Sequence, residues 1–142
     1  MSENKSMLES IYKNAEMGRD SIEDLTARTS DAQFRDALSH QRNEYQSIMD
    51  HADKLLSKRG HSPESVGSMA KVGAKMMVDA KTLIDPTVSN MAGMMIDGST
   101  RGIVKVTSEL NGYNSLDGDV RDLAERLLQT EQNNIDQMRQ FL

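Results

Sequence analysis

The chain has 142 residues, the length of one ordinary domain, and it carries a net charge of -5 with no cysteine. Two prolines and an aromatic content of 4% disfavour β-sandwiches and β-barrels, which need aromatic strands and frequent turns. The absence of cysteine excludes disulfides, thiolate metal sites and cysteine nucleophiles. The negative charge leaves no basic surplus for neutralising phosphates, which disfavours a nucleic-acid partner. We therefore expect a single all-α domain over residues 1–142.

The hydropathy pattern predicts a cytoplasmic protein. The N-terminus, Met-Ser-Glu-Asn-Lys-Ser-Met, lacks the apolar core of a signal peptide. No stretch of about 18 consecutive apolar residues occurs, so no transmembrane helix is predicted either. We therefore expect no membrane partner.

Five segments repeat apolar residues at spacings of three and four, which predicts five helices. The expected helices cover residues 6–28, 31–59, 63–84, 86–111 and 116–141. Ser6 and Glu9 have the spacing of a capping box at the start of the first helix. Ser30 is expected to open the second helix and Gly60 to close it.

Both prolines stand at a position that a helix tolerates, its first residue. Pro63 follows Ser62 and Pro86 follows Asp85, so each pair predicts a capping residue and a helix start. The fifth helix is expected to begin after Ser115. Neither proline is predicted to interrupt a helix.

Connection lengths constrain the topology. The connections around residues 29 and 113 are short, which predicts two antiparallel helix pairs. The segment 63–84 is long enough to return the chain along the bundle, so that the fourth helix runs parallel to the second. The expected fold is a four-helix bundle of two antiparallel pairs, with an additional helix in the long connection between them.

This order of helices resembles the ferritin-like superfamily. Three short sequences are also similar to a group of small bacterial ferritin-like proteins of the Firmicutes type, which has no assigned activity. They are Gly-His-Ser-Pro-Glu-Ser-Val-Gly-Ser at 60–68, Met-Met-Ile-Asp-Gly-Ser-Thr-Arg-Gly-Ile at 94–103 and Glu-Gln-Asn-Asn-Ile at 131–135. The likeness covers nearly the whole chain. Active ferritin-like proteins build a di-iron centre from one glutamate on each of two helices and a Glu-x-x-His pair on each of the other two.

The inner faces of the expected helices hold few residues of this kind. Glu131 and Asn134 lie three residues apart on the inner face of the fifth helix, with asparagine where the di-iron proteins have histidine. Gln41 lies at the centre of the second helix's inner face, and Glu44 is displaced from it by about 60–70°. His40 and Glu44 have the spacing of half a metal site on the flank of that helix. The candidate metal ligands are therefore Gln41, Glu44, Glu131, Asn134 and His40.

We interpret these residues as a depleted metal site, and no cofactor is expected. Iron needs several anionic ligands, and the nearby Arg19 would repel it. The favoured interpretation is a polar core layer whose side chains hydrogen-bond across the bundle and fix the helix register. Its expected members are Arg19, Gln41, Glu44, Ser99, Glu131 and Asn134. A single, weakly held iron or manganese ion is the alternative.

Methionine is frequent, with 11 residues. Six fall in the third and fourth expected helices: Met69, Met76, Met77, Met91, Met94 and Met95. Thioether side chains fill irregular gaps in a core, suit adaptable partner or dimer surfaces, and bind copper(I). Of these three roles, we favour packing in the core. A partner or dimer surface is the second choice, and a copper(I) site is the third. Gly98 and Gly102 would let another helix approach closely, within this chain or across a dimer.

No Gly-x-Ser-x-Gly sequence, Walker-type loop or dinucleotide fingerprint occurs, and no catalytic residue is expected. The sequence therefore predicts a non-catalytic binding or structural module that forms a homodimer, with an unknown protein partner. Two alternatives stay open. One is a ferritin-like metalloprotein with a mononuclear or di-metal site, of oxidoreductase or storage type. The other is a carrier of apolar small molecules that uses the methionine-rich region.

Overall fold

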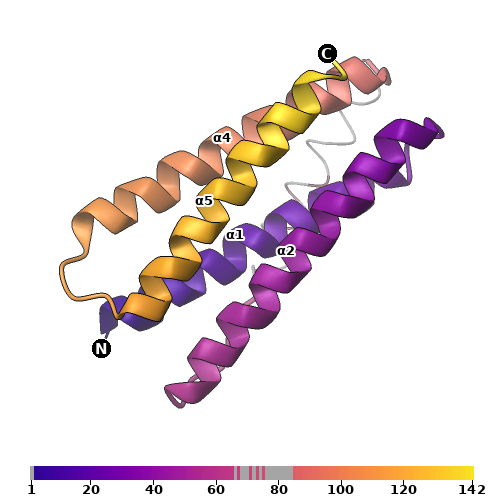
Figure 1. Ribbon diagram of the computed structural model, residues 1–142. Coiled ribbons are helices and arrows are strands. Elements are labelled where there is room, and N and C mark those ends of the chain that lie inside the picture. Colours follow the sequence, from indigo (N-terminus) through magenta and orange to yellow (C-terminus); the bar gives the residue numbers. More distant parts are fainter. Residues whose placement is uncertain (1, 66, 68–70, 72, 74, 76–84) are drawn as a thin grey trace.

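The computed structural model describes residues 2–65, 67, 71, 73, 75 and 85–142. Within this part of the chain there are four α-helices and no strand: α1 (Ser2–Thr26), α2 (Ala32–Lys58), α4 (Val88–Gly112) and α5 (Gly118–Arg139). Figure 1 shows α1 and α2 running antiparallel, as do α4 and α5, while α2 and α4 run in the same direction. The all-α prediction is confirmed, and the arrangement is compatible with a four-helix bundle.

The first helix begins earlier than predicted. It already includes Ser2, so Ser6 lies inside α1 and does not cap it. Tertiary contacts explain the additional turn. Oε1 of Glu3 accepts hydrogen bonds from the backbone N–H groups of Asn114 (3.0 Å) and Ser115 (2.9 Å) in the α4–α5 loop. The helix starts at this earlier residue because its first turn supplies hydrogen-bond acceptors for backbone N–H groups of the loop.

The start of α5 depends on the same loop. The predicted start after Ser115 is wrong by two residues, because the N-cap is Asp117 and the helix begins at Gly118. The Asp117 side chain makes no capping bond within the helix. Its backbone N–H instead donates to Oδ1 of the buried Asn4 at 2.8 Å. A side chain from α1 therefore takes part in the local structure at the start of α5.

A salt-bridge cluster joins the end of α2 to this start of α5. Nη2 of Arg59 donates to Oδ2 of Asp117 at 2.7 Å and to Oδ1 of Asp119 at 2.9 Å. The Arg59 side chain is only 14% exposed. The guanidinium hydrogen bond holds the pKa of Asp117 below its ordinary value. This cluster explains why Asp117 is not available to cap its own helix.

The second helix, predicted at 31–59, lies within one residue of these limits at each end but has a different cap. Its N-cap is Asp31, whose Oδ1 accepts from the backbone N–H of Phe34 at 2.8 Å, so the prediction that Ser30 caps α2 is wrong. Gly60 follows the C-terminus with φ of 79°, a conformation that glycine adopts without steric cost. The N–H groups of residues 60 and 61 then close the last turn. The predicted role of Gly60 is therefore confirmed.

The start of α4 also differs from the prediction. The cap is Thr87, whose hydroxyl accepts from the backbone N–H of Asn90 at 3.2 Å, and the helix begins at Val88. Asp85 uses its side chain for a different bond, accepting from the N–H of Thr87 at 3.1 Å. This local turn contains Pro86 and delays the helix by two residues.

The connection between α2 and α4 is described only in part. Residues 61–65 and 67 are not helical, so the prediction of a helix starting at Pro63 is wrong. Oγ of Ser65 donates to both carboxylate oxygens of Glu16, at 2.7 and 3.0 Å, which fixes this stretch on the side of α1. Helical backbone is described at residues 71, 73 and 75. The remainder of the predicted helix 63–84 lies outside the described residues.

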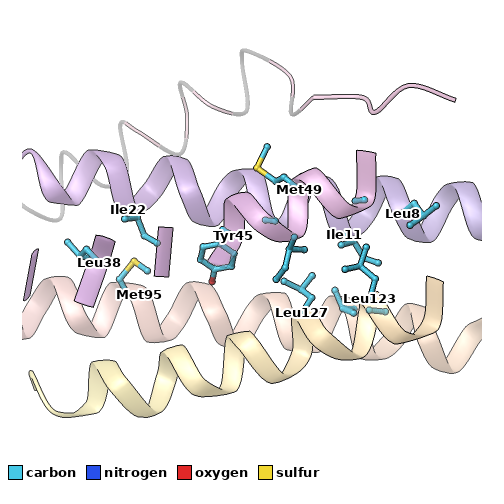
Figure 2. Packing of buried hydrophobic residues seen from close by; sticks show 14 of the residues in the cluster. Leu8, Ile11, Ile22, Leu38, Tyr45, Met49, Met95, Leu123 and Leu127 are labelled. Carbon is cyan, nitrogen blue, oxygen red and sulfur yellow. The ribbon is translucent and has the colours of Figure 1, made fainter. Parts of the chain in front are cut away.

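The core lies between α1, α2, α4 and α5, and each contributes buried apolar side chains (Figure 2). Those labelled in the figure are Leu8, Ile11, Ile22, Leu38, Tyr45, Met49, Met95, Leu123 and Leu127. Near the C-terminus the rings of Phe34 and Phe141 meet edge to face, with centroids 5.2 Å apart. Among the described helices, none has the length and apolar character needed to cross a membrane.

Candidate functional site

Polar side chains from α1, α2, α4 and α5 meet in the middle of this core. We call this cluster the polar centre, and it consists of Asn14 from α1, Tyr45 from α2, Ser99 from α4, and Glu131 and Asn134 from α5. All except the half-buried Asn14 are almost fully buried, with exposed fractions of 5% or less. Buried polar groups need hydrogen-bond partners, so the contacts within the cluster determine its chemistry.

Tyr45 spans the centre of the bundle. Its ring packs on α1 at Gly18, where a Cβ would lie 2.6 Å from ring carbon Cε2. Its hydroxyl points toward α4 and α5 (Figure 2) and hydrogen-bonds with Ser99, Glu131 and Asn134. Burial and the neighbouring Glu131 carboxyl raise the pKa of the phenol far above its ordinary value. Tyr45 is therefore neutral and acts as a hydrogen-bonding group.

Glu131 is the buried carboxyl of the polar centre, with 2% of its surface exposed. Burial raises its pKa from 4.5 to about 7, although the hydrogen bonds from Tyr45 and Ser99 act in the opposite direction. Among the described residues, no lysine, arginine or histidine forms an ion pair with it. Near neutral pH, the carboxyl is therefore divided between its protonated and ionised forms.

Gly102 provides the space for this carboxyl. A Cβ on Gly102 would lie 2.9 Å from Oδ1 of Asn14 and 3.4 Å from Oε2 of Glu131. The predicted close approach at Gly102 therefore occurs within this chain, against side chains of α1 and α5. Gly98, in contrast, is exposed and has no atom within 4 Å of its Cβ position.

A second polar contact lies one helical turn away along α2 and α5. Nε2 of the fully buried Gln41 donates to Oε1 of Gln137 at 2.8 Å. Within the described part of the chain, Oε1 of Gln41 is buried without a hydrogen-bond partner. This free acceptor leaves unsatisfied hydrogen-bonding capacity at this level of the core.

Four of the six residues predicted for the polar layer are indeed buried: Gln41, Ser99, Glu131 and Asn134. The structure does not bring Glu44 into the layer, because its side chain is 42% exposed and its Oε2 lies 4.0 Å from Arg126. Arg19 is also outside the layer, since its guanidinium donates to Asp20 and Gln46 on the side of the bundle. Long charged side chains reach water readily from the flank of a helix.

The candidate metal ligands are accordingly not brought together as one set. Gln41, Glu131 and Asn134 lie in the core, whereas Glu44 and the exposed His40 do not. Over the described ranges, no group of three or more histidine, aspartate or glutamate side chains has a geometry that could hold a metal ion. The methionines divide similarly: Met91 and Met95 are buried and Met94 packs beside them, while Met69, Met76 and Met77 lie outside the described residues.

Helical periodicity does not identify Asn14 or Glu16. Asn14 lies beside the apolar stripe of α1, and only the close approach of α4 at Gly102 places it in the centre. Glu16 is 4% exposed because the connection covers it, through Ser65 and through Lys71 at 3.4 Å. Tyr45 lies on the predicted apolar face of α2. Its hydroxyl group is the feature of the sequence that indicates a buried polar contact at this position.

The polar centre offers one titratable carboxyl, two hydroxyl groups and two amides. Comparison with protein-family models, with curated proteins and with solved structures finds no match for the chain. The chemistry of the polar centre is thus the basis for a functional proposal.

Proposed function

We propose that the protein is a non-catalytic binding or structural module: a ferritin-like helical bundle in which a hydrogen-bonded polar centre replaces a metal centre. The proposal includes a cytoplasmic homodimer. The observation that carries it is the environment of Glu131, whose buried carboxyl is held by the hydroxyl groups of Tyr45 and Ser99.

The donor set supports this proposal. A di-iron centre of the ferritin-like kind needs carboxylates from all of its helices. At the corresponding level here, α1 contributes an amide, α2 a phenol, α4 a hydroxyl and α5 one carboxyl beside one amide. The phenol ring also packs tightly on α1 at Gly18. One carboxyl among neutral groups is a weak ligand set for iron or manganese.

The same contacts suit a structural role. The Tyr45 hydroxyl meets Glu131 and Ser99 only at one relative position of α2, α4 and α5. Sliding one helix by a turn would leave these groups buried without partners, at a cost of about 1–3 kcal/mol for each group. A buried polar layer of this kind can select one register among many apolar packings.

Native mass spectrometry tests the proposal together with its alternatives. The full chain is purified from cells supplied with iron and manganese, and metal content is measured on the same sample. We expect a metal-free homodimer without a co-purified small molecule. One tightly bound metal per chain, lost on Glu131→Gln but retained on Glu44→Gln, would overturn the proposal in favour of a ferritin-like metalloprotein. A stoichiometric apolar molecule would instead support a carrier.

A further inference from the structure

Glu131 is surrounded by neutral groups on every helix that packs against it. Asn14 approaches from α1, Tyr45 from α2 and Ser99 from α4, while Asn134 lies one turn away on α5. The other titratable group among them is Tyr45, and its raised pKa keeps it neutral. An ionised Glu131 would therefore be a buried negative charge without a counter-ion, which is a costly arrangement.

Charged residues at the same level of the bundle are directed elsewhere. On the flanks of α1 and α2, Glu16 contacts Ser65 and Lys71, Arg19 contacts Asp20, and Glu44 contacts Arg126. Arg126 of α5 also donates to Oγ of Ser47. On α4, the charged residues nearest to Ser99, which are Asp97 and Arg101, are exposed. No described cation is therefore placed to neutralise Glu131.

The carboxyl of Glu131 and the amide of Asn14 both border the space above Gly102. Oε2 of Glu131 and Oδ1 of Asn14 both border this space, at 3.4 and 2.9 Å from the Cβ position of Gly102. The amide oxygen of Asn14 is an acceptor. A protonated carboxyl can donate a hydrogen bond to such an oxygen, whereas an ionised carboxylate has no proton to donate.

We propose that the polar centre is a proton-linked element of the fold: the helices pack most stably while Glu131 is protonated, and they loosen when the proton leaves for solvent. This inference rests on the proposed function, because a metal ion bound to Glu131 would take the place of the proton. The ligand of the centre is then a single proton, and the bundle responds to pH across the neutral range.

The direction of the effect follows from linkage. Glu131 has a pKa near 4.5 when exposed and about 7 in the folded protein. Between these values the folded chain binds a proton that the unfolded chain does not bind. The contribution of protonated Glu131 to the free energy of unfolding is therefore fully present below the lower pKa. It is lost as the pH rises through the upper pKa.

Urea unfolding at several pH values between about 5 and 8 tests this link. The full-length wild type is compared with Glu131→Gln, a neutral isostere, and with Glu44→Gln, which removes a surface carboxyl. We expect the unfolding equilibrium constant of the wild type to rise by a factor on the order of a hundred more than that of Glu131→Gln. Glu44→Gln should follow the wild type. Parallel profiles for wild type and Glu131→Gln would overturn the proposal.

Carboxyl carbon NMR of the wild type gives a second test that needs no variant to fold. We expect one glutamate to titrate with a midpoint near 7, and titration of every glutamate near 4.5 would overturn the proposal. Metal content measured on the same sample separates the two hypotheses. Stoichiometric metal refutes the proposed function, whereas metal-free protein with parallel stability profiles refutes the proton link alone.

Discussion

The ring of Tyr45 lies directly on the backbone of Gly18, so close that a Cβ on the glycine would come within 2.6 Å of the ring. This contact fixes how far the phenol extends across the bundle. Its hydroxyl then reaches Glu131 and Ser99 on the opposite helices. A glycine on α1 thus determines the position of a hydrogen bond between α2 and α5.

Gly18→Ala should displace the Tyr45 ring and lower the free energy of unfolding by about 1–3 kcal/mol, as overpacking does in other cores. Alanine favours helix by about 1 kcal/mol over glycine, so the packing cost must exceed this gain. Urea denaturation measures the difference. Gly98→Ala is the matched control, because its Cβ meets no atom within 4 Å, and it should stabilise the protein. Equal stabilisation by both changes would contradict the packing of Tyr45 on Gly18.

Tyr45→Phe should preserve the ring packing and remove the hydroxyl group. We expect a loss of about 1–2 kcal/mol in the free energy of unfolding, because Glu131 and Ser99 lose a hydrogen-bond partner. The Tyr45 hydrogen bond lowers the pKa of Glu131, so its removal should move this pKa further upward. Carboxyl NMR follows the change, and Tyr113→Phe at the edge of the core is the control. An unchanged Glu131 titration would rule out the Tyr45–Glu131 hydrogen bond.

Asn4→Ala should destabilise the start of α5, although the substitution is in α1. It removes the acceptor of the Asp117 N–H, and an unpaired backbone donor costs about 1–3 kcal/mol. Hydrogen exchange at Asp117 should become faster. Lys5→Ala, which changes a half-exposed neighbouring side chain, should leave this exchange rate unaltered. Unchanged protection in Asn4→Ala would show that the loop does not depend on α1.

Arg59→Ala should return the pKa of Asp117 toward its ordinary value, since the guanidinium hydrogen bond is the main cause of its depression. A carboxyl with a lowered pKa stabilises the fold above its unfolded value of about 3.8 and loses this contribution as the pH falls. Wild type should therefore lose more stability than Arg59→Ala on acidification. Carboxyl NMR and acid unfolding measure the two effects. The control is Lys58→Ala, whose removed side chain is 71% exposed; a similar change in the Asp117 titration there would contradict the assignment to Arg59.

Apolar periodicity was sufficient to locate α1, α2, α4 and α5, because each of these helices must bury one face. It was less reliable for their ends. Ser6 has good capping chemistry, yet Glu3 and Asn4 find partners in a distant loop and the helix starts earlier. Asp85 is also a good cap, but its side chain is used in a turn before Thr87. Contacts distant in sequence, and competition between adjacent capping residues, are not visible in a helical repeat.

The polar centre was predictable to the extent that its members lie on apolar stripes. Ser99 and Glu131 are on their stripes and are buried. Glu44 is on a flank, where a charged group can turn toward Arg126 and water. Asn14 and Glu16 were missed because other segments bury them, and the position of those segments is a property of the whole fold.

The anchoring of the first turn has a consequence for synthesis of the protein. Glu3 and Asn4 receive their hydrogen bonds from residues that follow them by 111 to 113 positions in the chain. A nascent chain leaving the ribosome can pair α1 with α2 early, because their contact is local. Its first turn has to wait until the α4–α5 loop has been translated. Closure of this end of the bundle is therefore a late event, in which residues translated before the rest of the bundle are among the last to reach their final contacts.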